Sequence, residues 1–255
     1  CLVRHIIIGD IHGMDREFED LIEKLALEPE DEVIFVGDLV DKGPNSPGVV
    51  KAVRELAERN RVVLVEGNHE NKHFRYRRNK VLRPQVAEEM AENRPELVTI
   101  TDTLTPEDVE FLNNTVPFYR VEEHNLLVVH AGIPANRKEL PETVEEAMVP
   151  KNWRKKFGDL MRTRSVHHET GSMVPLGKEG PKDPFWAEVY CGRFGHVVFG
   201  HQPFMEGPKE FAYGTGIDTG AVFGGYLTAL VFNEAGEREY VQVAGRKFAN
   251  PFPIL

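Results

Sequence analysis

The stretch His5-Ile6-Ile7-Ile8-Gly9-Asp10-Ile11-His12-Gly13 sets the pattern from which the fold of this chain is predicted. A short apolar run of this kind is typical of a buried β-strand. The glycine that follows lets the backbone turn sharply and leaves an aspartate and a histidine at the carboxyl end of the strand. Because open α/β sheets bind their ligands at that edge, the stretch predicts a strand that delivers polar side chains to a site.

The same arrangement of an apolar run and a polar cluster occurs four more times along the chain. A single Asp or His behind a strand is common and carries little weight, because most such residues cap helices or make ordinary hydrogen bonds. Five clusters in series predict strand ends that converge on one point. The four further clusters are Gly37-Asp38-Leu39-Val40-Asp41-Lys42-Gly43, Gly67-Asn68-His69-Glu70, His130-Ala131-Gly132 and Gly200-His201.

Helical patterns separate several of these strands and predict an α/β chain. Residues 18–25 place Phe and Leu on one helical face, and Ser46 and Thr105 each precede a proline, as N-caps do. The chain ends with two strands and a turn over 226–243, which predicts a hairpin and therefore mixed β-sheets flanked by helices. The Gly- and Pro-rich residues 171–184 predict a loop within one core.

Length and composition favour one enzyme-sized domain over residues 1–255. With 41% hydrophobic residues, a chain of 255 residues can bury about three-quarters of its unfolded surface. Apolar runs are far shorter than the ~20 residues of a membrane span, and no charged-then-apolar leader precedes them, so we expect a cytoplasmic protein. The two cysteines, Cys1 and Cys191, are too few for a disulfide framework, and Cys1 stands where an initiator Met is expected.

The net charge of −10 argues against general attraction to nucleic acid or to an anionic membrane. It is compatible with an anionic substrate, because two bound divalent cations would add about four positive charges at one point. We therefore expect neither membrane binding nor general nucleic-acid binding, and a phosphorylated small molecule, nucleotide or phosphoprotein as substrate.

These clusters resemble the motifs of the calcineurin-like metallophosphoesterases, in the branch of the phosphoprotein phosphatases and the symmetrical diadenosine tetraphosphatases. The resemblance extends from Gly9 to about Phe232 and includes Ile217-Asp218-Thr219-Gly220-Ala221-Val222-Phe223-Gly224-Gly225, a block similar to that of bacterial members. It implies the calcineurin-like fold and a binuclear metal-dependent phosphatase. Such an enzyme hydrolyses phosphate monoesters or phosphoanhydrides by attack of a metal-bridging hydroxide.

The resemblance also implies the ligands of two divalent metals. Mixed nitrogen and oxygen donors suit Mn, Fe or Zn better than Mg, and we expect Mn. A bridging carboxylate can hold two cations at the ~3.5–4 Å separation of two-metal hydrolases. The implied ligands are Asp10 and His12 for the first metal, Asn68, His130 and His201 for the second, and Asp38 as the bridge.

His69 is implied as the general acid, with Asp41 orienting it, because a carboxylate can hold an imidazole in one tautomer. Candidate phosphate-binding residues are Lys42, Arg162 and Arg164, although a solvated surface is an equal alternative for the two arginines. Lys42 stands where the family usually has Arg. Many protein phosphatases carry an Arg at the position of Glu66, which weakens a simple protein-phosphatase assignment.

The basic stretch from Lys72 to Arg83 contains six cations and no acid. We hypothesise that this stretch holds phosphates beyond the scissile one, with Arg75, Arg77 and Arg78 as the residues to test, the alternative being an ordinary solvated face. Residues 71–76 resemble a segment of small bacterial phosphatases of the PrpE type and of bacterial RNA-repair phosphatases, which favours nucleotide substrates. A phosphodiesterase or nuclease, an RNA-end phosphatase and a non-enzymatic metal-binding scaffold stay open as alternatives.

Overall fold

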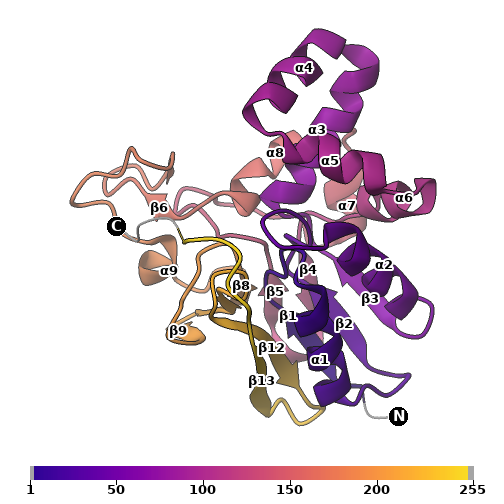
Figure 1. Cartoon of the computed structure of the whole chain (residues 1–255). Coiled ribbons are helices and arrows are strands. Elements are labelled where there is room, and N and C mark those ends of the chain that lie inside the picture. Colours follow the sequence, from indigo (N-terminus) through magenta and orange to yellow (C-terminus); the bar gives the residue numbers. More distant parts are fainter. Residues whose placement is uncertain (1–2, 252–255) are drawn as a thin grey trace.

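Two mixed β-sheets form the centre of the protein, as a computed structural model that describes residues 3–251 shows (Figure 1). The larger sheet has the order β11-β12-β1-β2-β3, with β13 also paired to β12, and the second has the order β4-β5-β8-β10-β9. The strands are β1 His5–Ile8, β2 Glu32–Phe35, β3 Arg61–Leu64, β4 Tyr119–Val121, β5 Leu126–Val128, β6 Ser165–Val166, β7 Met173–Val174, β8 His196–Phe199, β9 Lys209–Phe211, β10 Gly214–Gly216, β11 Asp218–Thr219, β12 Tyr226–Phe232 and β13 Arg238–Ala244.

The sheets are mixed, as predicted. Strands β1, β2 and β3 run parallel, whereas β12 is antiparallel to β1 and forms the predicted hairpin with β13. In the second sheet, β5, β8 and β10 are parallel. The carboxyl ends of β1, β2 and β3 therefore lie at one edge of their sheet, where the first three polar clusters begin.

The hydrophobic core lies in layers, and the alternation of side chains along β1 and β2 assigns them to different layers. Ile6 and Phe35 pack with the helices on the outer face of the larger sheet. Ile7 and Ile34 point the other way and pack against Val198 of the second sheet. The two sheets therefore face each other across a shared apolar layer, as in a β-sandwich, with helices outside.

Helices cover the sheets and also form a projecting lobe (Figure 1). We call α3, α4 and α5 the helical lobe; the sequence patterns did not predict it. It follows β3 and lies at the top of Figure 1. The helices are α1 Asp15–Leu25, α2 Ser46–Leu56, α3 Asn68–Leu82, α4 Pro84–Asn93, α5 Glu96–Thr103, α6 Pro106–Asn113, η1 Glu122–His124, α7 Val144–Met148, α8 Trp153–Lys156, η2 Gly158–Met161 and α9 Trp186–Val189.

One of the two predicted N-caps is wrong. Thr105 caps α6 as predicted, accepting a hydrogen bond from the Asp108 amide at 3.1 Å. Helix α2 is capped by Asn45, whose side chain accepts from the Gly48 amide at 2.9 Å. The Ser46 hydroxyl accepts instead from the Asp41 backbone amide at 2.9 Å, so it supports a loop of the candidate site.

Among residues 3–251, no helix has the length and apolar character that crossing a bilayer requires. The cytoplasmic location stays a prediction. Cys1 lies outside the described residues, and Cys191 is an exposed free thiol. Residues 171–184 form a loop apart from β7, which pairs with β6.

Candidate active site

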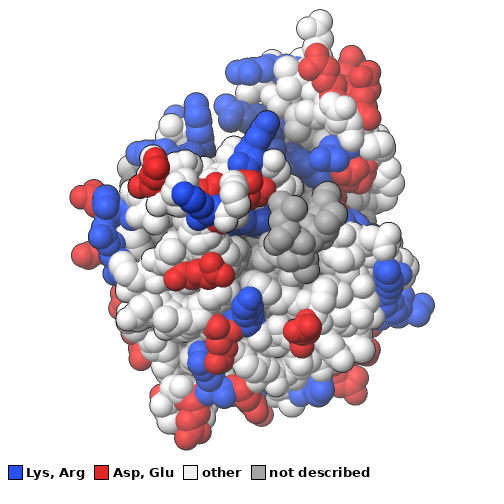
Figure 2. Space-filling model, turned by 90° about the vertical axis from the view of Figure 1, so that its left-hand side faces the viewer, with Lys and Arg blue, Asp and Glu red and all other residues white. Residues whose placement is uncertain are grey.

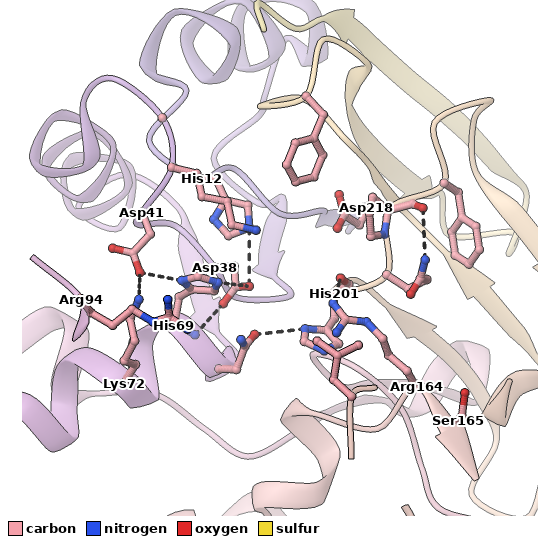
Figure 3. Close-up of a pocket in the computed structure, with 18 of the residues that line it drawn as sticks. His12, Asp38, Asp41, His69, Lys72, Arg94, Arg164, Ser165, His201 and Asp218 are labelled. Atoms are coloured by element: carbon pink, nitrogen blue, oxygen red, sulfur yellow. Dashed lines mark hydrogen bonds and ion pairs between the residues drawn. The ribbon is translucent and has the colours of Figure 1, made fainter. Parts of the chain in front are cut away.

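The first three predicted metal ligands, Asp10, His12 and Asp38, meet behind β1 and β2, and Figure 3 shows His12 and Asp38 of this group. The His12 Nε2 atom lies 3.8 Å from the Asp10 Oδ2 atom and 3.6 Å from the Asp38 Oδ2 atom. All three side chains are buried. The structure thus brings two carboxylates close to the His12 imidazole.

The other three predicted ligands lie on the opposite side of Asp38. The Nε2 atom of His130 is 3.2 Å from the Asp38 Oδ2 atom and 3.0 Å from the Asn68 Oδ1 atom. The Asn68 Oδ1 atom is also 3.1 Å from the His201 Nδ1 atom. Asp38 is therefore central to both halves of the cluster, which is where a bridging carboxylate has to be.

Backbone strain is concentrated in this cluster. Five of the seven non-glycine residues with positive φ in the described part of the chain lie here, and such conformations persist only where the surroundings enforce them. Two glycines bring the segments this close: a Cβ on Gly67 would lie 2.2 Å from an Asp38 carboxylate oxygen, and one on Gly200 would lie 2.1 Å from an Asp10 oxygen. The five strained residues are His12, Asp38, Asp41, Lys42 and His201.

Backbone carbonyls fix the tautomers of two imidazoles. The Nδ1–H of His12 donates to the Val40 carbonyl, and that of His130 donates to the Val36 carbonyl, each at 2.8 Å. The Nε2 atoms of both rings therefore face the Asp38 carboxylate, at 3.6 Å for His12 and 3.2 Å for His130. Orientation of this kind is usual for metal-binding histidines.

Glu70 holds the loop after β2 in place. Its buried carboxylate accepts hydrogen bonds from the backbone amides of Asp38 at 2.5 Å, Leu39 at 3.0 Å and Gly67 at 3.1 Å. It therefore ties the second polar cluster to the third. Glu70 was part of the quoted motif, but its structural role was not predicted.

The carboxylates of the cluster repel one another, as expected of a site that holds cations. Burial, reinforced by Asp218, raises the pKa of Asp10 well above its ordinary value. Burial also raises the pKa of Glu70 to about 8 and that of Asp218 to about 6. For Asp38 burial acts in the same direction, but the imidazoles around it, first that of His130, hold its pKa well below the usual range.

The donor atoms fit two divalent metals. In the described part of the chain, His12, Asp38 and His69 offer donor atoms that all lie within 4.8 Å of one another, and so do Asp38, His130 and His201. The first group contains His69 rather than the predicted Asp10. The two oxygens of the Asp10 carboxylate lie 3.2 and 3.3 Å from the His201 backbone nitrogen, from which they accept a hydrogen bond.

The predicted acid and its partner are in direct contact. The Nδ1–H of His69 donates to an Asp41 carboxylate oxygen at 2.6 Å, and its Nε2 atom lies 4.0 Å from the Asp38 Oδ2 atom. Burial would raise the pKa of Asp41, but hydrogen bonds from His69 and His73 hold it well below its ordinary value. Asp41 is thus an anion that keeps the Nε2 atom of His69 facing the cluster.

Two residues for which the sequence analysis predicted no contact with the acid pair also hold Asp41. The Nε2–H of His73 donates to the other Asp41 oxygen at 2.7 Å, and the Lys72 ammonium lies 2.7 Å from the first. The His73 side chain is buried, and its Nδ1 atom has no hydrogen-bond partner among the described residues. The signal that could have found it is spacing, since His69 and His73 are four residues apart on one face of α3.

We predict that His73 is a positioning residue for Asp41. His73→Leu should lower kcat for an alkyl phosphate about 10-fold, since hydrogen bonds to charged groups contribute roughly 1.5–3 kcal/mol. His73→Gln keeps an N–H donor and should restore most of the rate. The comparison is measured on an alkyl phosphate and on p-nitrophenyl phosphate. Equal losses on both substrates, or no rescue by Gln, would point to a purely structural role.

Two of the three candidate phosphate-binding residues line the cavity, and the third does not. Lys42 and Arg164 line the cavity above the cluster, and an Arg164 Nη2–H donates to the His201 carbonyl at 3.2 Å. Arg162 is not among the residues that line it. Its guanidinium donates to the Asn71 side chain at 2.9 Å and to the Gly158 carbonyl at 3.2 Å.

The basic stretch lies on the helical lobe, and only Lys72 of its six cations lines the cavity. Arg75 donates to Asn71 at 3.1 Å, Arg77 donates to Asn113 at 2.8 Å, and Arg78 is exposed. The three arginines therefore do not line the site at which the sequence hypothesis placed them.

Glu66, which stands where many protein phosphatases have a substrate-binding arginine, makes structural contacts in this protein. Its buried carboxylate accepts from the Arg154 guanidinium at 2.8 Å and from the Thr115 hydroxyl at 3.1 Å. The Arg154 guanidinium in turn stacks on Phe74, 3.8 Å from the ring centroid. The ion pair ties α8 to the end of β3 beside the site.

A fold of two facing mixed sheets, with clustered metal donors at the strand ends, defines a metal-dependent hydrolase of phosphoric esters. The chain belongs to the calcineurin-like phosphoesterase family, whose model matches residues 3–205.

Curated relatives are similar over nearly the whole chain. Two are the asymmetrical bis(5′-nucleosyl)-tetraphosphatase PrpE of Oceanobacillus iheyensis, 32% identical with 94% of this chain and 92% of that protein covered, and its namesake from Bacillus cereus, 33% identical with 91% and 92% covered. Their names specify the asymmetrical reaction, whereas the resemblance in the sequence was to symmetrical enzymes.

Solved structures share the fold. A crystal structure of a candidate diadenosine tetraphosphatase superposes with a TM-score of 0.71 at 26% identity, covering 95% of this chain and 94% of that one. A protein serine/threonine phosphatase from Saccharomyces cerevisiae superposes with a TM-score of 0.61 at 14% identity, covering 98% and 81%. The second likeness concerns the fold alone.

Proposed function

We propose that this enzyme hydrolyses dinucleoside tetraphosphates asymmetrically, to a nucleoside monophosphate and a nucleoside triphosphate. The observation that carries the proposal is the similarity to relatives named for that activity, which extends over more than nine-tenths of the chain. The protein phosphatase likeness supports the phosphoprotein alternative less, because it extends to the fold only.

The cavity above the cluster supports a long anionic substrate. Its volume is about 1700 Å³, whereas the pockets of drug-sized ligands measure about 300–1,000 Å³. Figure 2 shows many Lys and Arg side chains on the upper half of the face that it views. Although the net charge of the chain is −10, six cations line the cavity, namely Lys42, Lys72, Arg94, Arg164, Lys182 and Lys209.

The two metals would be held by the six predicted ligands, and we propose manganese. Three imidazoles, two carboxylates and an amide oxygen form the mixed donor set that suits Mn, Fe or Zn. When bound, the metals supply positive charge for the phosphoryl oxygens and an activated water as nucleophile. The proposed ligands are Asp10, His12, Asp38, Asn68, His130 and His201.

The remaining chemistry falls to side chains of the chain itself. His69 donates the proton on its Nε2 atom to the leaving-group oxygen, while Asp41 holds the ring through its Nδ1–H. Arg164 and Lys42 line the cavity beside the cluster and bind non-bridging phosphate oxygens. In this assignment Arg162 has no role in the reaction.

We expect purified enzyme with Mn²⁺ to convert diadenosine tetraphosphate to AMP and ATP in equal amounts, measured by anion-exchange chromatography. After chelation, activity should return more fully with Mn²⁺ than with Fe²⁺ or Zn²⁺. A phosphopeptide, an RNA 3′-phosphate and a phosphodiester are compared in parallel, with Asp38→Asn protein as the control for contaminating enzymes. Two molecules of ADP, or a clear preference for another substrate, would contradict the proposal.

A further inference from the structure

One wall of the cavity is built by the helical lobe rather than by the sheets. Helix α5 presents Glu96, Thr99, Ile100 and Thr103 to the cavity. Their spacing of three, four and seven residues places them on a single helical face. Arg94 lies just before this helix and lines the same wall.

The wall is tied directly to the proposed acid. The Lys72 ammonium lies 2.7 Å from the Asp41 carboxylate and 3.0 Å from that of Glu96. Figure 3 shows Arg94 and Lys72 beside Asp41, with Arg164 on the other side of His69 and Asp38. The wall therefore lies on the His69 side of the cluster, which is the side where the leaving group receives its proton.

The charges on this wall single out one cation. Asp41 and Glu96 share Lys72, so these three groups together carry one negative charge when the imidazoles are neutral. Arg94 is exposed, and its guanidinium makes no hydrogen bond or ion pair with any described residue. Without Arg94, the net negative charge of the wall would repel a polyphosphate. The Arg94 guanidinium adds a positive charge and five N–H donors that can bind phosphate oxygens.

We propose that Arg94 and the cavity face of α5 form the subsite for the leaving nucleotide. Arg94 binds its phosphates, for which the planar guanidinium offers paired donors. Ile100 lines the cavity together with Pro44, in the loop before α2, and Pro47, in the first turn of α2, and these residues offer apolar surface for the nucleoside. This inference rests on the proposed function and adds to it which residues bind the nucleotide that departs.

The test compares Arg94→Ala with Arg83→Ala. Arg83 is exposed at the other end of α4 and does not line the cavity, so it controls for the loss of one charge from the lobe. Arg94→Ala should raise KM for diadenosine tetraphosphate about 10-fold or more with little change in kcat, and much more than KM for p-nitrophenyl phosphate. Arg94→Lys should recover part of the loss, and the difference should shrink at high salt.

An unchanged KM for diadenosine tetraphosphate, an equal rise in Arg83→Ala, or an equal loss on p-nitrophenyl phosphate would overturn the inference. If the unaltered enzyme does not cleave diadenosine tetraphosphate, the proposed function fails. The subsite is then judged by inhibition of p-nitrophenyl phosphate hydrolysis with a non-hydrolysable ATP analogue. A weaker inhibition constant in Arg94→Ala supports the subsite, and an unchanged one overturns it.

Discussion

Asp38→Asn should lower turnover more than about 100-fold and reduce bound metal below two ions per chain. Asp38 lies between the His12 and His130 imidazoles at 3.6 and 3.2 Å, so its charge serves both halves of the cluster. A neutral amide is a poor bridge between two cations. Mutating a residue that only hydrogen-bonds to a metal ligand typically lowers metal affinity or activity about 10–100-fold. Removing the charge of the bridging ligand itself should lower turnover further.

The folded structure should survive this change, which makes the result interpretable. The Asp38 Oδ1 atom accepts from the His69 backbone amide at 3.0 Å, and an asparagine oxygen can accept the same bond. Metal content by mass spectrometry, thermal unfolding and turnover are measured together. Asp102→Asn, at an exposed carboxylate of α5, is the matched control. Near-normal turnover with two metals bound would contradict the bridging role.

The convergence of the five clusters was predictable because strand ends are constrained. The runs before Asp10 and Asp38 are parallel neighbours, so their carboxyl ends must share an edge. The glycine after each run indicated the sharp turn. The sequence could not predict which neighbours each side chain contacts, such as the hydrogen bond that the Asp10 carboxylate accepts from the His201 backbone amide.

The helical lobe was not predictable from hydrophobic periodicity. The residues that α3 buries are mostly polar, namely Glu70, Asn71 and His73 besides Tyr76. Their burial depends on partners such as Asp41 that are distant in sequence, so no apolar stripe marks the helix. The position of Arg162 away from the cavity was not predictable for the same reason. An Arg-x-Arg spacing does not reveal that the Asn71 side chain accepts a hydrogen bond from the first arginine.

The cap of α2 failed for a related reason. Asn45 and Ser46 are both good N-cap residues, and the proline after Ser46 favoured the serine. The Asp41 amide, in a strained turn, needs a hydrogen-bond acceptor, and the Ser46 hydroxyl supplies it. The Ser46 hydroxyl is therefore used by the loop of the site, and Asn45 caps the helix instead.

His69→Asn should slow the hydrolysis of an alkyl phosphate about 10²–10⁴-fold, the usual contribution of a general acid, and p-nitrophenyl phosphate far less. The alkoxide needs a proton as it leaves, whereas the nitrophenolate is stable without one. The protein should stay folded, because Asp41 keeps its contacts with His73 and Lys72. His124→Asn, in the short helix η1 between β4 and β5, is the control.

The same variant also reports on the natural substrate class. A nucleotide leaving from a phosphoanhydride departs from an oxygen about as acidic as a phosphate whose second pKa is near 6. The loss on diadenosine tetraphosphate should therefore resemble the small loss on p-nitrophenyl phosphate rather than the large loss on the alkyl ester. Equal losses on all three substrates would remove His69 from the role of acid and leave it a role in binding the metals or the phosphate.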